Sequence, residues 1–334
     1  MAGYSIRREF DQRKMGVRLP GEAAQKPSPI EWDVINRQLP GGRFRYRVTN
    51  NITVFDEQGI EREPIWAINI HGFFAGGSMY ARESEQLAAR LGWRVVNPSL
   101  PGFGGSAPLA EEEISLDRLT DFVDLVRDEL SIKQCVLLGH SMGGAVAVQY
   151  AMRHPEEILA LIYRDGVATP QWQVRSGVSA RALSHIVPDA AQMVDLVGAV
   201  ALDVPDLLVG HLFTTVKALL PDLRSNFSMI MRAAPVAEML RTIDLTASVK
   251  ELVSAEIPIY PVWGCFDRVI ANETAEAFSE VAGVPIQWVP GGHSWMLARP
   301  SGQSDLLTIV PSGVSFNETI LKRARDRRAT PTIK

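Results

Sequence analysis

Cysteine is scarce in this sequence, and its scarcity excludes one class of fold. Only Cys135 and Cys265 occur among 334 residues, which is too few for a disulfide framework. We place them on two strands that are not neighbours and interpret both as structural thiols. The six histidines show neither H-E-x-x-H nor Cys/His ligand spacing, so we expect no metal site and no cofactor.

Positive charge and long apolar runs are also lacking. A formal net charge of −4 gives no global electrostatic reason to bind nucleic acid. No stretch approaches the roughly 20 apolar residues of a membrane span, and the Arg-rich start is not followed by the apolar core of a signal peptide. We therefore expect a cytoplasmic protein with no integral membrane segment and no nucleic-acid partner.

The composition is that of a large globular chain, with 46% hydrophobic and 22% charged residues. Apolar runs of strand length alternate with helical patterns, which predicts an α/β fold with a mostly parallel twisted sheet flanked by helices. The predicted buried strands are 65–70, 93–97, 135–138, 158–163, 257–264 and 284–289, and the predicted helices are 80–91, 116–130 and 271–281. Alternation at 44–48 and 52–55 predicts two antiparallel edge strands before them.

The pattern divides the chain into three parts. Residues 1–42 contain four prolines and are predicted to form an N-terminal arm on the surface. Residues 43–166 and 255–334 carry the α/β pattern, closed by a last helix that starts at Ser315, where Glu318 completes a capping box. Residues 167–254 show helical patterns only and predict a helical cap inserted after the sixth strand, because such a block is too long for a loop.

A candidate nucleophile follows the strand 135–138. Ser141 lies in the sequence Gly139-His140-Ser141-Met142-Gly143-Gly144, between that strand and a predicted buried helix. A tight strand-to-helix turn requires small residues two before and two after its apex, and Gly139 and Gly143 meet that requirement. The pattern therefore indicates a nucleophile elbow, although a serine at such a turn can also serve only as a helix N-cap.

Two later loops supply an acid and a base. Asp267 follows the strand 257–264, and His293 follows the strand 284–289. The carboxyl ends of parallel strands share one edge of a sheet, and the chain order Ser141, Asp267, His293 is that of one known class of serine triad. Asp165, also at a strand end, is a rival for the acid.

These residues fit nucleophilic catalysis. His293 would take the proton of Ser141 as general base, and Asp267 would orient the imidazole and stabilise its protonated form. Backbone N–H groups of Met142 and Phe73 are the candidates for an oxyanion hole, because one follows the nucleophile and the other follows His71-Gly72.

The chain resembles the α/β-hydrolase fold superfamily, in its branch with a helical cap. The resemblance rests on His71-Gly72-Phe73, on residues 101–106 (Pro-Gly-Phe-Gly-Gly-Ser), on the elbow and on the Asp267 and His293 loops, and it spans about residues 44–300. It implies the same oxyanion amides that the residues themselves indicate.

The chain departs from the family pattern at two places. Phe74 stands where many relatives have proline, and Ser99 stands where many have an acidic residue. The apex is serine rather than aspartate, which argues against the epoxide-hydrolase and haloalkane-dehalogenase branches. Ser141 points instead to acyl chemistry.

We therefore predict a serine hydrolase that cleaves a carboxylic ester of an apolar small molecule. The apolar character is inferred from the Leu- and Met-rich cap and from aromatic residues in the strand-end loops. We place Phe74, Phe103, His140 and Trp295 around the substrate.

Other functions stay open. Relatives with Ser-Met-Gly-Gly elbows hydrolyse a carbon–carbon bond in diketone-like ring-fission products, and thioester hydrolysis and cofactor-free perhydrolysis are further variants of the chemistry. A ligand receptor that retains the triad in a capped pocket is the alternative from a different class. The sequence leaves open whether the chain forms a homo-oligomer.

Overall fold

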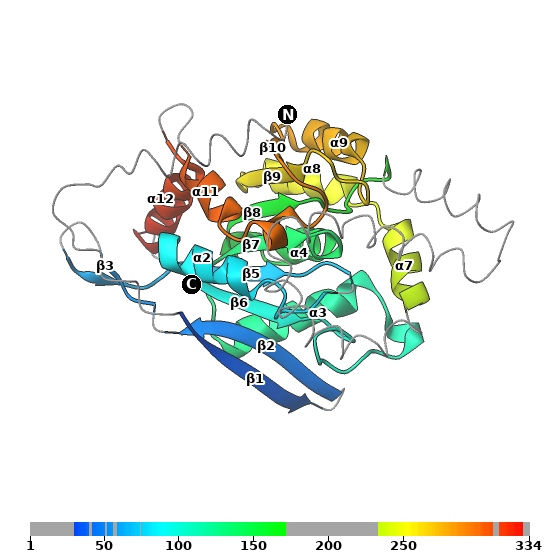
Figure 1. Ribbon diagram of the computed structural model, residues 1–334, viewed down its shortest axis with the longest axis horizontal. Helices are drawn as coiled ribbons and strands as arrows, with labels where there is room; N and C mark the ends of the chain where they lie inside the picture. The colour runs from blue at the N-terminus through cyan, green and yellow to red at the C-terminus, as the bar shows by residue number, and fades with distance from the viewer. Residues whose placement is uncertain are drawn as a thin grey trace, which may run out of the picture.

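The computed structural model describes residues 30–39, 42–50, 52–55, 59–73, 75–171, 233–309 and 314–329. An eight-stranded sheet forms the centre, in the order β1-β2-β6-β5-β7-β8-β9-β10 (Figure 1). Its strands are β1 (Glu31–Leu39), β2 (Gly42–Asn50), β5 (Trp66–Ile70), β6 (Arg94–Ser99), β7 (Cys135–His140), β8 (Ile158–Arg164), β9 (Ile259–Gly264) and β10 (Gln287–Val289).

Six strands, β6, β5, β7, β8, β9 and β10 in sheet order, run parallel, and β2 pairs antiparallel with β6. Every residue of β5, β7 and β8 is buried. A strand covered by helices on both faces needs apolar side chains on both faces. The continuous apolar runs of the sequence therefore become the central strands, and each predicted buried strand is present.

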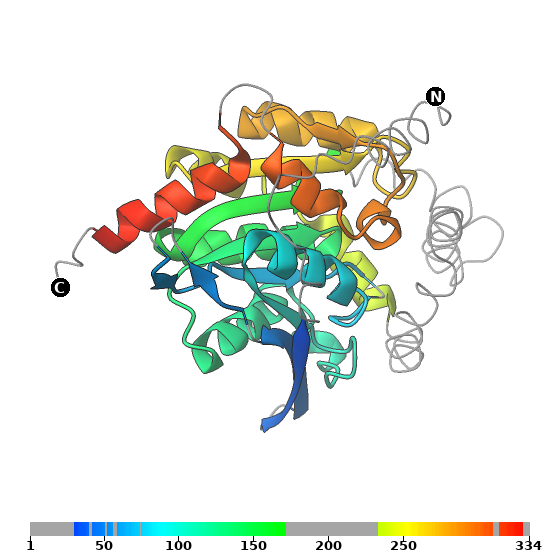
Figure 2. The ribbon, with the colours of Figure 1, turned by 60° about the vertical axis from the view of Figure 1, so that its left-hand side comes forward.

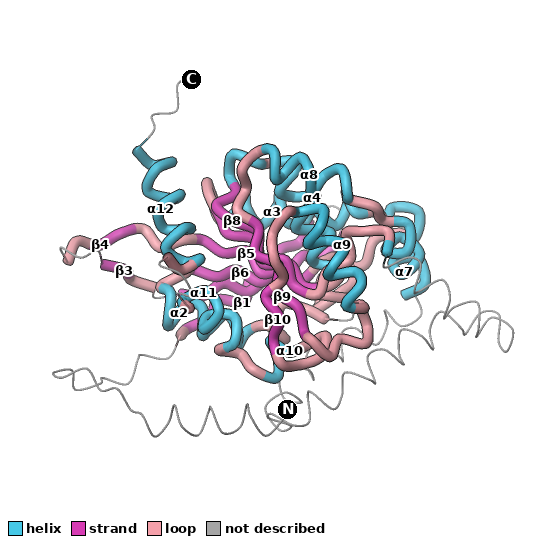
Figure 3. Tube along the Cα trace, turned by 90° about the horizontal axis from the view of Figure 1, so that it is seen from above, coloured by secondary structure: helices cyan, strands magenta, loops and turns pink. Residues whose placement is uncertain are grey.

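Helices cover both faces of the sheet. Within the described residues the helices are α2 (Ala81–Leu91), α3 (Leu116–Glu129), α4 (Met142–Arg153), α7 (Ala233–Thr242), α8 (Thr246–Ser254), α9 (Asn272–Ala282), α10 (Trp295–Ala298), α11 (Gly302–Thr308) and α12 (Phe316–Ala329), with 3-10 turns at Glu111–Glu113 and Pro155–Glu157. Viewed from above, α3, α4, α8 and α9 lie on one side of the sheet, and α2, α10 and α11 lie on the other (Figure 3). Two apolar clusters, one on each side, form the core. No helix in the described ranges is long and apolar enough to cross a membrane.

The prediction that residues 1–42 form a surface arm is wrong for its last part. Glu31–Leu39 is a nine-residue edge strand that pairs antiparallel with β2 along its whole length. The prolines at 27, 29 and 40 flank this strand without interrupting it. Most of its side chains are exposed, and its polar–apolar alternation stops after Val34, which is too short to predict a half-buried strand. The β1–β2 hairpin projects from the body of the protein (Figure 2).

The second predicted edge strand is also placed differently. Val54–Phe55 (β3) pairs with Glu61–Arg62 (β4) in a separate two-stranded sheet. Only β2 of the predicted pair joins the main sheet, where Phe44, Tyr46 and Val48 are buried. Phe55 stays 61% exposed, which explains why its short apolar alternation does not mark a core strand.

The helix at the C-terminal end begins as the sequence predicts. The backbone N–H of Glu318 donates to the Ser315 hydroxyl at 3.1 Å, and the backbone N–H of Ser315 donates to the Glu318 carboxylate at 2.6 Å. These reciprocal bonds are a capping box and satisfy two amides at the start of α12.

The middle of the predicted cap lies outside the described residues, which resume at 233. From there α7 and α8 follow, and α8 packs on α4 and α9. Val249 and Leu252 of α8 are buried in the same cluster as the elbow helix. The division of the chain into core and cap stays a prediction.

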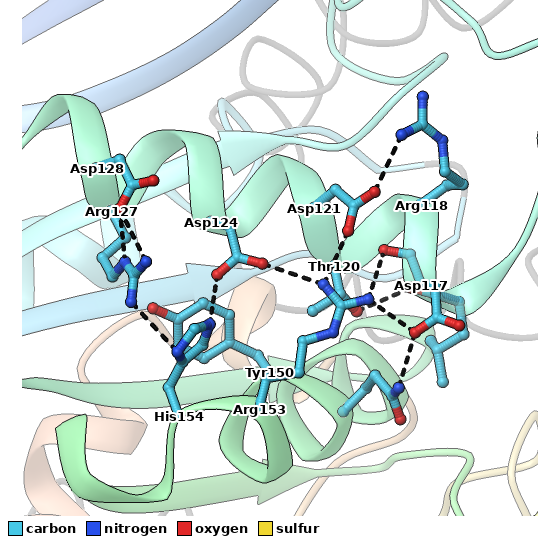
Figure 4. Close-up of polar contacts among 12 residues, drawn as sticks. Asp117, Arg118, Thr120, Asp121, Asp124, Arg127, Asp128, Tyr150, Arg153 and His154 are labelled. Atoms are coloured by element: carbon cyan, nitrogen blue, oxygen red, sulfur yellow. Dashed lines mark hydrogen bonds and ion pairs between the residues drawn. The ribbon is translucent and has the colours of Figure 1, made fainter.

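A network of ion pairs joins α3 to α4 (Figure 4). The Arg153 guanidinium, from the end of α4, lies 2.7 Å from the carboxylate of Asp117, 2.8 Å from that of Asp121 and 3.1 Å from that of Asp124. One cation therefore links three carboxylates of the neighbouring helix. The Arg153 side chain is 26% exposed, so solvent screens these attractions less than it screens those of an open surface pair.

Replacing Arg153 should reveal this linkage. We expect Arg153→Met to lower the free energy of unfolding by about 1 kcal/mol in urea titrations, because three carboxylates lose their shared cation. Arg118→Met is the matched control, since Arg118 pairs with Asp121 of the same helix and with Glu113 of the preceding turn, and neither ion pair reaches α4. Equal losses for the two variants would contradict the interhelical role.

Candidate active site

Ser141 occupies a strained turn between β7 and α4. Its backbone angles are φ 54° and ψ −121°, a region that a residue with a side chain rarely adopts. The turn is held by a hydrogen bond from the Ser141 N–H to the Arg164 carbonyl at 3.0 Å. The hydroxyl is not used as an N-cap acceptor within the helix. Strain and a hydroxyl outside the helix distinguish this serine from an ordinary capping residue.

The glycines around Ser141 allow the backbone to pack closely. A Cβ atom added to Gly139 would lie 2.5 Å from the Gly143 carbonyl oxygen, and one added to Gly143 would lie 2.7 Å from the His71 carbonyl oxygen. Neither position has room for a side chain. The small residues predicted around the apex are therefore required because the elbow packs against β5 and its own strand.

The predicted base and acid are hydrogen-bonded to each other. The distance between His293 Nδ1 and Asp267 Oδ2 is 2.9 Å, and both residues are buried. The other oxygen of Asp267 accepts the backbone N–H groups of Val269 at 2.7 Å and Ile270 at 2.9 Å. Three donors thus fix the carboxylate, and His293 Nε2 is the ring nitrogen that can face a nucleophile.

Asp165, the predicted rival, lies beside this pair but has different partners. One of its oxygens accepts the backbone N–H of Gly264 at 2.8 Å, and the other accepts Nε1–H of Trp295 at 2.8 Å. Burial, and next the charge of Asp267, raise the pKa of Asp165 well above its ordinary value. Asp165 therefore links the end of β9, which precedes Asp267, to the start of α10, which follows His293.

A metal ion is a further use to consider for these side chains. Donor atoms of Asp165, Asp267 and His293 all lie within 4.8 Å of one another. The His293 nitrogen on this side already donates to a carboxylate, and the Asp267 oxygens accept from amides and the ring. That arrangement suits an acid–base pair better than a coordination shell, in which the imidazole nitrogen and the carboxylates would both have to turn to the ion.

The loop of His71, Gly72 and Phe73, which we call the oxyanion loop after its predicted role, lies directly against Ser141. A Cβ atom on Gly72 would lie 3.1 Å from Ser141 Cβ. His71 holds this loop, because its Nε2 accepts the Leu100 N–H at 3.0 Å, which leaves Nδ1–H to donate to the Gly72 carbonyl at 2.7 Å. The loop that leads to Phe73 thus lies against Ser141, and Met142 begins α4 directly after this serine.

Of the four residues predicted to surround the substrate, the three that the structure describes are buried. Phe74 lies outside the described residues. Phe103 is fully buried and packs edge-on against Phe73, with ring centroids 5.8 Å apart. Trp295 is buried and donates to Asp165, and both ring nitrogens of His140 have protein partners. Trp295 and His140 therefore have positioning contacts, and their predicted contact with substrate stays a prediction.

The sequence interpretation missed a buried polar network behind the elbow. Arg164 and Glu83 form an ion pair with both side chains fully buried. Asn69 connects them, because its Oδ1 accepts from Arg164 at 2.7 Å and its Nδ2 donates to Glu83 at 3.0 Å. The carbonyl of the same Arg164 receives the Ser141 N–H. The available signal was a charged residue at the end of a fully apolar strand and a glutamate on the apolar side of helix 80–91.

The sequence is similar to those of known proteins. A family model described as the alpha/beta hydrolase fold matches residues 68–280. A predicted non-heme haloperoxidase of Mycobacterium phage D29 is 28% identical over 250 residues, which cover 71% of this chain and 85% of that protein. Lipase 3 of Moraxella sp. (strain TA144) is 24% identical over 245 residues, which cover 72% and 71%.

Solved structures agree in fold. A carboxylesterase structure from Nitrososphaera gargenis superposes with a TM-score of 0.60 and 17% identity, covering 87% of this chain and 100% of that one. Because the family model spans more than half of the sequence, the chain belongs to the alpha/beta hydrolase fold family. The resemblance to the superfamily and the predicted α/β fold with a mostly parallel sheet flanked by helices are confirmed, and the helical cap after the sixth strand stays a prediction.

The histidine of the oxyanion loop should make stability depend on pH. Burial lowers the pKa of His71 from 6.5 to about 4. Between pH 6.5 and pH 4 the ring is therefore protonated in the unfolded chain and neutral in the folded chain. The contribution of His71 to the free energy of unfolding is fully present above pH 6.5, and it falls by about 3 kcal/mol in all as the pH drops toward 4.

The measurement compares the wild type with His71→Asn in urea titrations from pH 7 to pH 4. The variant has no titrating ring at this position, so the stability difference between the two proteins should shrink as the pH falls. Other acidic groups and His140 are present in both proteins and cancel. A difference that stays constant over this range would contradict a buried neutral His71.

Proposed function

We propose that this chain is a serine hydrolase that cleaves a carboxylic ester through an acyl-enzyme on Ser141. The observation that carries the proposal is the buried hydrogen bond between His293 and Asp267 at 2.9 Å, at the same sheet edge as a serine in a strained elbow. Structural or capping roles for these residues explain neither the strain nor the pairing.

The proposed reaction begins with proton transfer. His293 Nε2 accepts the Ser141 hydroxyl proton as the serine oxygen attacks the ester carbonyl carbon. The resulting oxyanion accepts N–H groups of Phe73 and Met142, and Asp267 stabilises the protonated imidazole. The tetrahedral intermediate then expels the alcohol, which takes the proton from His293. Water, activated by the same imidazole, hydrolyses the acyl-enzyme and restores the hydroxyl.

The choice of an ester is supported by the relatives. Their names include a lipase and a carboxylesterase, and a serine nucleophile suits acyl transfer. The apolar character of the acyl group is proposed from the composition of residues 167–254 and from Phe73 and Phe103, which place aromatic rings beside the oxyanion loop.

A panel of p-nitrophenyl esters of rising acyl chain length tests the substrate class. We expect turnover that improves from acetate toward longer acyl chains, and a loss of about a million-fold in Ser141→Ala. A cinnamoyl-type diketone is assayed beside the esters. Turnover of the diketone alone would replace the ester hydrolase with a carbon–carbon bond hydrolase, and tight binding with no turnover of either would favour a receptor.

A pair of isosteric variants tests which carboxylate is the acid. Asp267→Asn should lower kcat/KM by about ten-thousand-fold, because His293 loses the anion that orients it and stabilises its charge. Asp165→Asn should cost less than about tenfold, since this carboxylate bonds to Gly264 and Trp295 rather than to the ring. The reverse ranking, measured on folded variants of matched Tm, would transfer the acid role to Asp165.

A further inference from the structure

Two loops that must cooperate in catalysis come from distant parts of the chain. One carries Gly72 and the oxyanion donor Phe73, and the other carries the base His293. Between them lie two buried side chains, Tyr80 and His140, which are 1% and 3% exposed. Neither side chain is needed for the proton transfers of the proposed reaction, so their burial between the loops calls for its own explanation.

A continuous chain of hydrogen bonds runs through these side chains. The Gly72 N–H donates to the Tyr80 hydroxyl oxygen at 3.2 Å. The Tyr80 hydroxyl lies 2.6 Å from Nδ1 of His140, and Nε2 of His140 lies 2.9 Å from the carbonyl oxygen of His293. We call this chain the Tyr80–His140 bridge. It joins a backbone amide of the oxyanion loop to a backbone carbonyl of the base loop.

The chemistry of the groups fixes the direction of each hydrogen bond. The His293 carbonyl can only accept, so Nε2 of His140 carries a hydrogen. Nδ1 of a neutral ring then has none and accepts the Tyr80 O–H, whose oxygen is left to accept the Gly72 N–H. A neutral His140 therefore satisfies all three bonds at once, with the Tyr80 O–H used as a donor. Burial, and next the charge of His293, lower the pKa of His140 well below its ordinary value.

Packing reinforces the same connection. The rings of His140 and His293 lie 4.6 Å apart between centroids. A Cβ atom on Gly72 would lie 3.0 Å from His140 Nδ1, so the oxyanion loop rests directly on the imidazole. His140 therefore contacts the oxyanion loop on one side and the catalytic base on the other, and it precedes the nucleophile in the chain.

We propose that Tyr80 and His140 are positioning residues that hold the oxyanion loop and the base loop in a fixed position relative to each other around Ser141. This inference rests on the proposed serine hydrolase function and names the device that aligns its parts. The bridge acts through backbone groups, so its loss should lower kcat and leave KM within about twofold. A missing buried hydrogen bond in such a device corresponds to about tenfold in kcat.

Hydrogen exchange measured by mass spectrometry tests the bridge without reference to any substrate. Tyr80→Phe removes only the hydroxyl. We expect faster amide exchange in peptides covering 71–79 and also in peptides covering 291–298, with β7 unchanged. A merely local role for Tyr80 would change only the first segment, and a general loss of stability would change all three.

Tyr150→Phe is the matched control. Tyr150 is a fully buried tyrosine of the elbow helix, but its hydroxyl faces Glu157 at 3.4 Å. We expect this variant to keep wild-type exchange in both loops and wild-type kcat, even where its Tm falls.

A double-mutant cycle supplies the kinetic test. Tyr80→Phe and His140→Gln both break the bond between the hydroxyl and Nδ1, while glutamine can keep a donor for the His293 carbonyl. The kcat of the double variant should therefore be no lower than that of the less active single variant.

The outcomes separate the two proposals. Wild-type exchange in the 291–298 peptides of Tyr80→Phe overturns the bridge, as do additive losses in the cycle. A wild type that hydrolyses no acyl compound overturns the proposed function instead, and the exchange measurement still decides whether the bridge exists.

Discussion

The close approach of backbone to backbone at the nucleophile elbow is the constraint on which the rest of the site depends. A side chain at Gly143 would run into the carbonyl groups at the end of β5, so α4 can start only where this residue is glycine. That contact places the first turn of α4 beside the loop of Gly72. Ser141, directly before α4, has a strained conformation, and the fully buried strands β5, β7 and β8 around the turn sustain that cost.

The electrostatics of the site are arranged in layers around the imidazole of His293. Asp267 contacts the ring directly, whereas Asp165 lies one step further out and organises the strand and helix on either side. His71 and His140 stay neutral because they are buried, and burial lowers the pKa of each. Neutral rings can donate with one nitrogen and accept with the other, which is what lets them join loops. In the proposed site, His293 takes part in the chemistry, and His71 and His140 hold the geometry.

The sequence predicts those parts of the molecule that local patterns encode. The parallel strands can be predicted because a strand covered on both faces must be continuously apolar, and the residues of the proposed triad can be predicted because each follows such a strand. The capping box of Ser315 is equally local. The sequence does not predict the strand Glu31–Leu39, because its mostly exposed residues carry no sustained core pattern. It also does not predict the separate sheet of Phe55, because two apolar residues do not specify a partner strand.

Long-range polar contacts were the part that the sequence could not predict. The pairing of Arg164 with Glu83 joins residues 81 positions apart, and Tyr80 and His140 are separated by 60. Neither spacing matches a motif, because it is the fold that brings them together. His140 illustrates the difference: its position beside Ser141 suggests a contact with substrate, which stays a prediction, but nothing in the sequence indicates that its two ring nitrogens bond to Tyr80 and to the His293 carbonyl.

The central claim is that Ser141 forms a covalent acyl intermediate, and rapid-quench mass spectrometry tests it most directly. The wild type is mixed with excess p-nitrophenyl ester, quenched in acid within milliseconds, digested and mapped. The account predicts a burst of p-nitrophenol and a peptide carrying the mass of the acyl group on Ser141, with neither in Ser141→Ala. Turnover without a burst or adduct, or an acyl group on another residue with turnover retained in Ser141→Ala, would contradict it.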